Sequence, residues 1–194
     1  MRMLILGPPG AGKGTQASRL AAHYAIPAIS TGDIFRANIA EGTPLGVRVQ
    51  DIVNSGGYVP DELTNELVKS RLSEPDAAEC FLLDGYPRTG AQVDELDAML
   101  AAEGRSLDAV AELTVPGEEL IERLVLRAQT DGRVDDTAEV IRSRQELYTE
   151  QTAPLLAVYR DRGLLVQVDG LGEVDEVSER LFAALDSHLA RTAS

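Results

Sequence analysis

A glycine-rich segment near the N-terminus limits the possible folds of this chain more than any other feature. Residues 7–15 read GPPGAGKGT, which matches the phosphate-loop pattern G-x-x-x-x-G-K and places Gly14 and Thr15 after Lys13. The pattern is informative only between a strand and a helix. Both are predicted here, because residues 3–6 form a short apolar run and a helical pattern begins at Lys13. We therefore expect backbone N–H groups of this loop to bind phosphate, with the Lys13 ammonium group on the β- and γ-phosphates.

The rest of the chain alternates short apolar runs with longer helical patterns. This alternation predicts an α/β fold, a P-loop NTPase-type parallel sheet flanked by helices. Strands are expected at residues 3–6, 27–29, 81–84, 109–115 and 164–168. Helices are expected at residues 13–24, 92–103, 118–127 and 137–162, the last one bent at Pro154. Residues 30–59 and 128–136 fit neither pattern, so we expect inserts that form binding surfaces.

The composition restricts the partners of the chain. Its 194 residues suit a single domain, and its formal charge of -14 argues against nucleic acid or an anionic membrane as a partner. Cys80 is the only cysteine, which excludes an intramolecular disulfide and a multi-cysteine zinc site. The apolar run at residues 3–6 is too short for a signal peptide or a membrane span. A cytoplasmic protein is therefore expected.

Charged residues near the expected strand ends indicate phosphate chemistry. Asp84 ends an apolar strand, as a Walker-B acid does, and is expected to hold Mg²⁺ through water. Two polyphosphates that meet in one cleft repel each other, and arginine side chains can neutralise them because they bind phosphate bidentately and stay charged. The arginines of interest by position are Arg36, Arg88, Arg123, Arg127, Arg133 and Arg144.

A general base is not needed if the acceptor is itself a phosphate, because phosphate is largely ionised at neutral pH. The only histidines, His23 and His188, lie in no motif, and both are expected on helix surfaces. We identify no placed aspartate base for a hydroxyl acceptor, which argues against a kinase of small hydroxylated metabolites.

Further motifs follow the phosphate loop along the chain. They are STGDIFR at 30–36, GGYVPDEL at 56–63, FLLDGYPRT at 81–89, GRVDD at 132–136, TAPL at 152–155 and VDG at 168–170. In sequence and order, these motifs closely resemble those of the adenylate kinase family, over essentially the whole chain. UMP/CMP kinases share the phosphate loop and GRVDD, so a UMP/CMP kinase remains the alternative.

The resemblance implies a single kinase domain, residues 1–194, with three parts. The core would comprise residues 1–29, 60–125 and 137–194, a small helical NMP-binding insert residues 30–59, and a short lid loop residues 126–136. The lid contains no cysteine. The resemblance therefore implies Mg²⁺ with ATP and no zinc, and a monomer.

The resemblance also assigns roles to single residues. The ATP site would comprise Gly10, Ala11, Gly12, Lys13, Gly14, Thr15, Arg123, Arg127 and Gly172. The AMP site would comprise Thr31, Arg36, Gly57, Tyr58, Val59, Gly85, Tyr86, Pro87, Arg88, Gln92, Arg133 and Arg144. The catalytic residues would be Lys13, Asp84, Arg88, Arg133 and Arg144. The nucleotide phosphates would hold Mg²⁺, with Asp84 and Thr15 contributing through water.

The implied reaction is reversible phosphoryl transfer from ATP to AMP, giving two ADP. Pyrimidine kinases typically carry Ala where this chain has Thr31, and Asn where it has Gln92. A glutamine offers one donor and one acceptor to the adenine edge, which favours AMP. Thr31 has a second interpretation as the cap of a helix that starts near Asp33. A regulatory module without turnover is disfavoured because Lys13, Asp84 and the lid arginines are all present.

Overall fold

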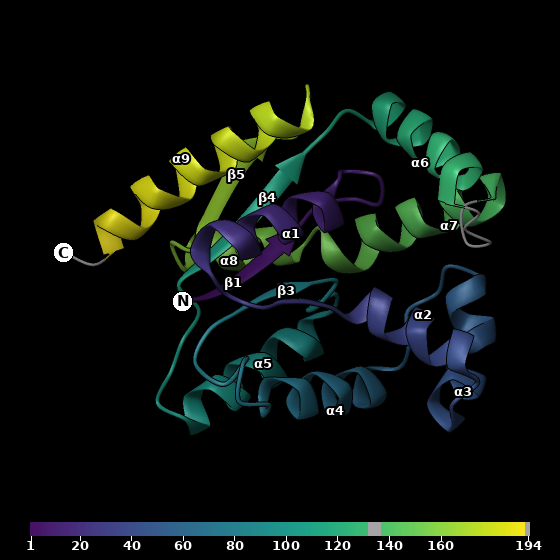
Figure 1. The fold of residues 1–194 in the computed structure, drawn as a ribbon, viewed down its shortest axis with the longest axis horizontal. Coiled ribbons are helices and arrows are strands. Elements are labelled where there is room, and N and C mark those ends of the chain that lie inside the picture. Colours follow the sequence, from purple (N-terminus) through teal and green to yellow (C-terminus); the bar gives the residue numbers. More distant parts are fainter. Residues whose placement is uncertain (132–136, 193–194) are drawn as a thin grey trace.

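The computed structural model describes residues 1–131 and 137–192, and its centre is a parallel β-sheet (Figure 1). The five strands lie in the order β2-β3-β1-β4-β5. They are β1 (Arg2–Leu6), β2 (Ala28–Ser30), β3 (Phe81–Asp84), β4 (Ala109–Thr114) and β5 (Leu165–Asp169). Ile5 of the central strand pairs with Asp84 on one side and Ala111 on the other. This arrangement confirms the predicted α/β fold and brings Asp84 beside the end of β1.

Helices cover both faces of the sheet. The α-helices of the described residues are α1 (Lys13–Tyr24), α2 (Thr31–Glu41), α3 (Pro44–Asn54), α4 (Asp61–Leu72), α5 (Gly90–Ala102), α6 (Gly117–Asp131), α7 (Ala138–Leu147), α8 (Leu155–Asp161) and α9 (Val174–Thr192). One apolar core joins α1 and α9 to the sheet, with Leu20 and Leu181 fully buried. A second core joins α4, α5 and α8 to the opposite face, around Leu83, Leu96 and Tyr159.

Helices α2 and α3 form a separate unit at one end of the molecule (Figure 1). A third, small core holds them together, built from Phe35, Val49 and Val59. The two helices cross closely at Gly46, where a Cβ atom would lie 2.1 Å from the carbonyl oxygen of Asn38. Only glycine permits that approach. Leu63 and Leu67 of α4 pack against this small core and so join the unit to the rest of the fold.

The helix expected over residues 137–162 is not continuous. A π-helical segment, η1 (Tyr148–Thr152), separates α7 from α8. The N–H of Ala153 donates to the carbonyl of Tyr148 at 2.8 Å, which is the wider π pattern. Pro154 has no N–H and cannot restore the α-helical ladder. The predicted bend is therefore a change of helix type that begins before the proline.

One side-chain prediction is wrong. His188 was expected on a helix surface, yet it is 5% exposed on the inner face of α9. His23 is exposed as expected, and its ring stacks on Phe182 at 3.9 Å between ring centres. The error arose because the sequence did not show which face of α9 packs on the sheet.

Candidate active site

A cavity of about 460 Å³ lies where β1 and β3 end. The loop between β1 and α1 supplies one wall, and α2, α6 and α7 supply side chains from elements far apart in the sequence. The lining residues that the sequence predicted are Gly10, Gly12, Lys13, Gly14, Thr15, Arg36, Tyr58, Asp84, Gly85, Pro87, Arg88, Arg123, Arg127 and Arg144. The carboxyl end of a parallel sheet is where α/β proteins bind ligands.

The phosphate loop has the geometry that its glycines predict. Gly10 and Gly12 have φ angles of 90° and 87°, in the left-handed region, and α1 begins directly after Gly12. The ammonium group of Lys13 donates to the carbonyls of Gly7 at 2.7 Å and Pro8 at 3.0 Å. Gln145 of α7 donates to the carbonyl of Pro9 at 2.9 Å, which ties the loop to the opposite side of the cavity. The loop is thus held in shape by the protein itself.

The charges in the cavity perturb one another. Removal of water lowers the pKa of Lys13 to about 8, and the positive charges of Arg88, Arg144 and Arg127 act in the same direction. The carboxylate of Asp84 opposes this shift. Burial raises the pKa of Asp84, although Lys13 and Arg88 favour its charged form. A set of cations that destabilise one another provides a site for a highly charged anion.

A smaller cavity of about 60 Å³ adjoins the first and reaches under α2 and α3. Both cavities are lined by Arg36, Arg88 and Arg144. The predicted residues that line the smaller cavity are Thr31, Arg36, Gly57, Tyr58, Val59, Arg88, Gln92 and Arg144. The two cavities therefore form a path from the phosphate loop to the small helical unit.

Gln92 is buried and held from two sides. Its side-chain carbonyl accepts from the N–H of Arg88 at 2.7 Å, and its amide nitrogen donates to Asp61 at 2.7 Å. Asp61 also accepts from Thr89 at 2.9 Å. These contacts use one donor and one acceptor of the amide, which leaves one of each. Sequence reasoning missed Asp61, although it lies within the GGYVPDEL motif.

Thr31 does not cap α2. Ser30 is the N-cap, because its hydroxyl accepts from the N–H of Asp33 at 3.3 Å. Thr31 is buried and donates to the carbonyl of Gly85 at 3.0 Å, beside the smaller cavity. The capping interpretation of Thr31 is therefore wrong, and Thr31 lines the smaller cavity.

Thr152 is a second residue that sequence reasoning missed. Its hydroxyl donates to the carbonyl of Arg88 at 2.9 Å and lies 2.8 Å from the hydroxyl of Tyr58. The Arg88 guanidinium lies over the Tyr58 ring, 4.9 Å from its centre, and donates to the carbonyl of Gly85 at 2.7 Å. The π-helical segment thus holds Arg88, one of the three arginines that line both cavities. The TAPL motif was the only sequence signal for Thr152.

Three predicted residues are not among those that line the two cavities: Ala11, Tyr86 and Gly172. Ala11 is buried within the phosphate loop, and Tyr86 is buried in the core with its hydroxyl 2.7 Å from Asn65. Arg133 lies outside the described residues. Residues 126–131 of the expected lid continue α6, and the rest of the lid, residues 132–136, also lies outside the described residues.

Within residues 1–131 and 137–192, no group of three or more His, Cys, Asp or Glu side chains is placed to hold a metal ion. None of the described helices has the length and apolar character of a membrane span.

Comparison with known proteins gives a consistent result. A sequence model described as adenylate kinase matches residues 5–164. An adenylate kinase of Nocardioides sp. is 62% identical over 186 residues, covering 96% of this chain and 97% of the relative. The adenylate kinase of Clavibacter michiganensis subsp. michiganensis is 58% identical over 193 residues, covering 100% and 96%. That of Leifsonia xyli subsp. xyli is 61% identical over 183 residues, covering 94% and 92%.

Proposed function

The chain belongs to the adenylate kinase family, and from this premise we propose which residues bind each nucleotide and where the phosphoryl group crosses. Its activity is the reversible transfer of a phosphoryl group from ATP to AMP, which gives two ADP. No observation favours the UMP/CMP kinase alternative. The observation that carries the residue assignment is the sharing of Arg36, Arg88 and Arg144 by two adjoining cavities.

The larger cavity is assigned to ATP. The phosphate loop, Gly10 to Thr15, surrounds the β- and γ-phosphates with N–H groups at the start of α1, where the helix dipole also favours an anion. The Lys13 ammonium group exchanges its two carbonyl acceptors in the loop for phosphate oxygens. Arg123 and Arg127 line the same cavity and lie against the donor nucleotide.

The smaller cavity is assigned to the base of AMP. Thr31, Gln92 and the segment Gly57 to Val59 surround it. The free donor and acceptor of Gln92 complement the N1 and 6-amino edge of adenine. The AMP phosphate lies against Arg36 and Arg88, beside the backbone of Gly85 and Pro87. This placement points the acceptor phosphate toward the end of the phosphate loop.

Transfer needs neutralisation and alignment rather than a general base. Lys13, Arg88 and Arg144 line the junction of the cavities and offset the charge that develops on the moving phosphoryl group. Arg133 stays a predicted contact of the same kind. Mg²⁺ bound to ATP supplies further neutralisation. The buried Asp84 carboxylate lies beside Gly14, 3.9 Å from where a Cβ atom would be, and so suits an ion held by phosphates and by water near Thr15.

The same proposal includes a monomer that works in the cytoplasm. One copy of the chain contributes residues to both nucleotide sites, so catalysis requires no second copy. Sedimentation velocity at assay concentrations tests the monomer, and a stable dimer would contradict it.

An acceptor panel tests the proposed function directly. ATP consumption is measured in a coupled assay with AMP, UMP, CMP or GMP as the acceptor. We expect AMP to exceed UMP and CMP by about a hundredfold in kcat/KM, the scale set by polar groups left unpaired in a built site. Comparable turnover of UMP or CMP would assign the smaller cavity to a pyrimidine instead.

A further inference from the structure

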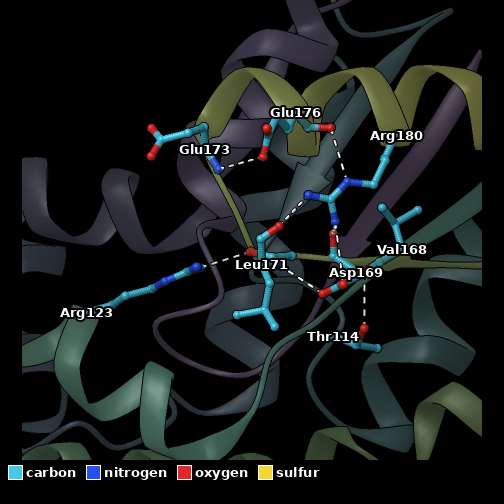
Figure 2. A network of polar contacts seen from close by, with 9 residues as sticks. Thr114, Arg123, Val168, Asp169, Leu171, Glu173, Glu176 and Arg180 are labelled. Atoms are coloured by element: carbon cyan, nitrogen blue, oxygen red, sulfur yellow. Dashed lines mark hydrogen bonds and ion pairs between the residues drawn. The ribbon is translucent and has the colours of Figure 1, made fainter.

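An arginine of α9 forms hydrogen bonds to the loop that follows β5. Figure 2 shows the Arg180 side chain extending from the helix to Asp169 and Leu171. Its guanidinium donates to the carbonyls of Asp169 and Leu171, and its Nε donates to the carbonyl of Glu176 at 3.3 Å. The carboxylate of Asp169 lies 3.7 Å from the same group. One side chain therefore fixes two alternate carbonyls of a short loop to the first turns of α9.

A second arginine holds the carbonyl between those two. Arg123 of α6 donates to the carbonyl of Gly170 at 3.2 Å (Figure 2). The N–H of Gly170 donates to Thr114 at 2.9 Å, and that of Leu171 to the Asp169 carboxylate at 3.0 Å. Three successive carbonyls thus accept from arginines on two different helices. Since Arg123 also lines the larger cavity, this network connects the loop to the donor site.

The loop lies directly between Arg180 and the phosphate loop. A Cβ atom at Gly172 would lie 3.0 Å from Nη2 of Arg180 and 2.6 Å from the Glu176 carboxylate. A Cβ atom at Gly170 would lie 3.6 Å from the carbonyl oxygen of Ala11 in the phosphate loop. Gly172 has a φ of 105°, which a side chain would strain. The backbone at Gly172 therefore lies beside the Arg180 guanidinium and the Glu176 carboxylate, with no room for a side chain.

We propose that Arg180 is a positioning residue for the donor nucleotide, which holds residues 169–173 in the shape that lets the Gly172 backbone meet the adenine of ATP. The proposal rests on the assignment of ATP to the larger cavity. Gly172 itself lies outside the lining of that cavity, and Arg123, which holds Gly170, connects the loop to it. Arg180 acts through the loop and touches no substrate. A backbone carbonyl accepts from the 6-amino group of adenine but opposes the 6-oxo group of guanine, so the loop's shape also sets the preference for ATP over GTP.

The purely structural alternative is that Arg180 only anchors α9. Its side chain is 37% exposed, and exposed ion pairs contribute little to global stability. If Arg180 only anchors α9, Arg180→Ala should lower the melting temperature and change the KM for ATP and the KM for AMP equally. A positioning role predicts a selective effect on the donor.

The test compares Arg180→Ala with the unaltered enzyme in initial-rate assays that vary ATP, GTP and AMP separately. We expect the KM for ATP to rise about tenfold, the scale of one lost hydrogen bond, and the preference for ATP over GTP to fall. The KM for AMP should stay within about twofold, because binding energy at the acceptor site is untouched. Arg180→Lys keeps the charge but loses the fork, so it should retain most of the defect.

Arg19→Ala is the matched control. Arg19 pairs with Asp175 in the first turn of α9, and in the described part of the chain it forms no hydrogen bond or ion pair with residues 169–173. This variant also removes an arginine tie to α9, and we expect it to leave the KM for ATP and the base preference unchanged. If Arg180→Ala instead changes the KM for ATP and the KM for AMP equally, or matches Arg19→Ala in every kinetic constant, the positioning role is wrong.

Gly172→Val separates this proposal from the donor assignment on which it rests. Its side chain would strain the loop and collide with Glu176 and Arg180. If Gly172→Val raises the KM for ATP while Arg180→Ala does not, only the role of Arg180 is overturned. If neither variant changes the KM for ATP in a protein with native circular dichroism, the loop does not contact the donor, and both the role and the donor assignment at Gly172 are overturned.

Discussion

At the scale of single residues, the pKa of Lys13 shows why the site favours a bound polyphosphate. Its ammonium group is surrounded by arginines and removed from water, which lowers its pKa to about 8. The ligand-free protein therefore loses the Lys13 proton at a lower pH than an exposed lysine would. A bound triphosphate reverses the balance, because a nearby negative charge favours the protonated form.

We predict that ATP binding takes up protons at pH 8 to 9. The sign follows from the pKa, since the free protein is partly deprotonated at Lys13 and the complex is protonated. Calorimetry in buffers of different ionisation enthalpy measures this uptake directly. Lys13→Met should abolish it and reduce kcat by orders of magnitude while circular dichroism stays native, because the lost charge acts on the moving phosphoryl group. Equal proton uptake by the variant would show that another group titrates.

Gln92 carries the prediction for the acceptor base. Its amide spans from the Arg88 N–H to Asp61, and asparagine is one methylene too short to hold both contacts. Gln92→Asn should therefore lower kcat/KM for AMP and narrow its advantage over CMP and UMP, with the KM for ATP nearly unchanged. Asp61→Asn should have a smaller effect in the same direction, because Gln92 remains but loses a charged acceptor.

A matched substitution controls for the loss of one methylene. Gln50→Asn makes the same change at an exposed position of α3, and all kinetic constants should be preserved. Unchanged acceptor selectivity in Gln92→Asn would remove Gln92 from the base site.

At the scale of elements, the sequence predicted the sheet well. Each strand is a short apolar run bounded by glycine, proline or a polar residue, so its position can be read locally. The interruption at Tyr148–Thr152 could not be read in this way. That segment contacts Arg88 and Tyr58 through Thr152, and residues so distant in sequence leave no local pattern. The burial of His188 was missed for the same reason, because it depends on how α9 packs.

In the site too, features formed by neighbouring residues could be predicted from the sequence, and contacts between distant residues could not. The phosphate loop could be predicted because its glycines, lysine and helix start lie within nine residues, 7 to 15. The roles of Gln92 and the arginines came from resemblance to a family, since spacing alone did not bring them together. The contacts that hold these residues, between Gln92 and Asp61 and between Thr152 and Arg88, join different elements and emerged only from the fold.

At the scale of the whole molecule, positive charge is concentrated at the larger cavity. The chain has a formal charge of -14, yet six of its 18 Lys and Arg residues line the larger cavity. This concentration attracts anions to one place on an otherwise acidic protein. The α2–α3 unit lies at one side of the path, and a small core around Phe35 and Val49 holds its two helices together.

We predict that this unit closes over AMP and that the end of α6 closes over ATP. A bisubstrate analogue, two adenosines joined by five phosphates, should slow amide hydrogen exchange in residues 30–59 and 126–131. Closure has a chemical purpose, because water competes with AMP for the γ-phosphate and must be excluded. AMP alone should protect mainly residues 30–59, and a non-hydrolysable ATP analogue mainly residues 126–131. Residues 109–113 of β4 serve as the internal reference, since they are buried in the sheet and should exchange equally with and without ligand. Unchanged exchange in both segments at saturating analogue would contradict the assignment of residues 30–59 as an acceptor insert that closes, and would require a rigid site.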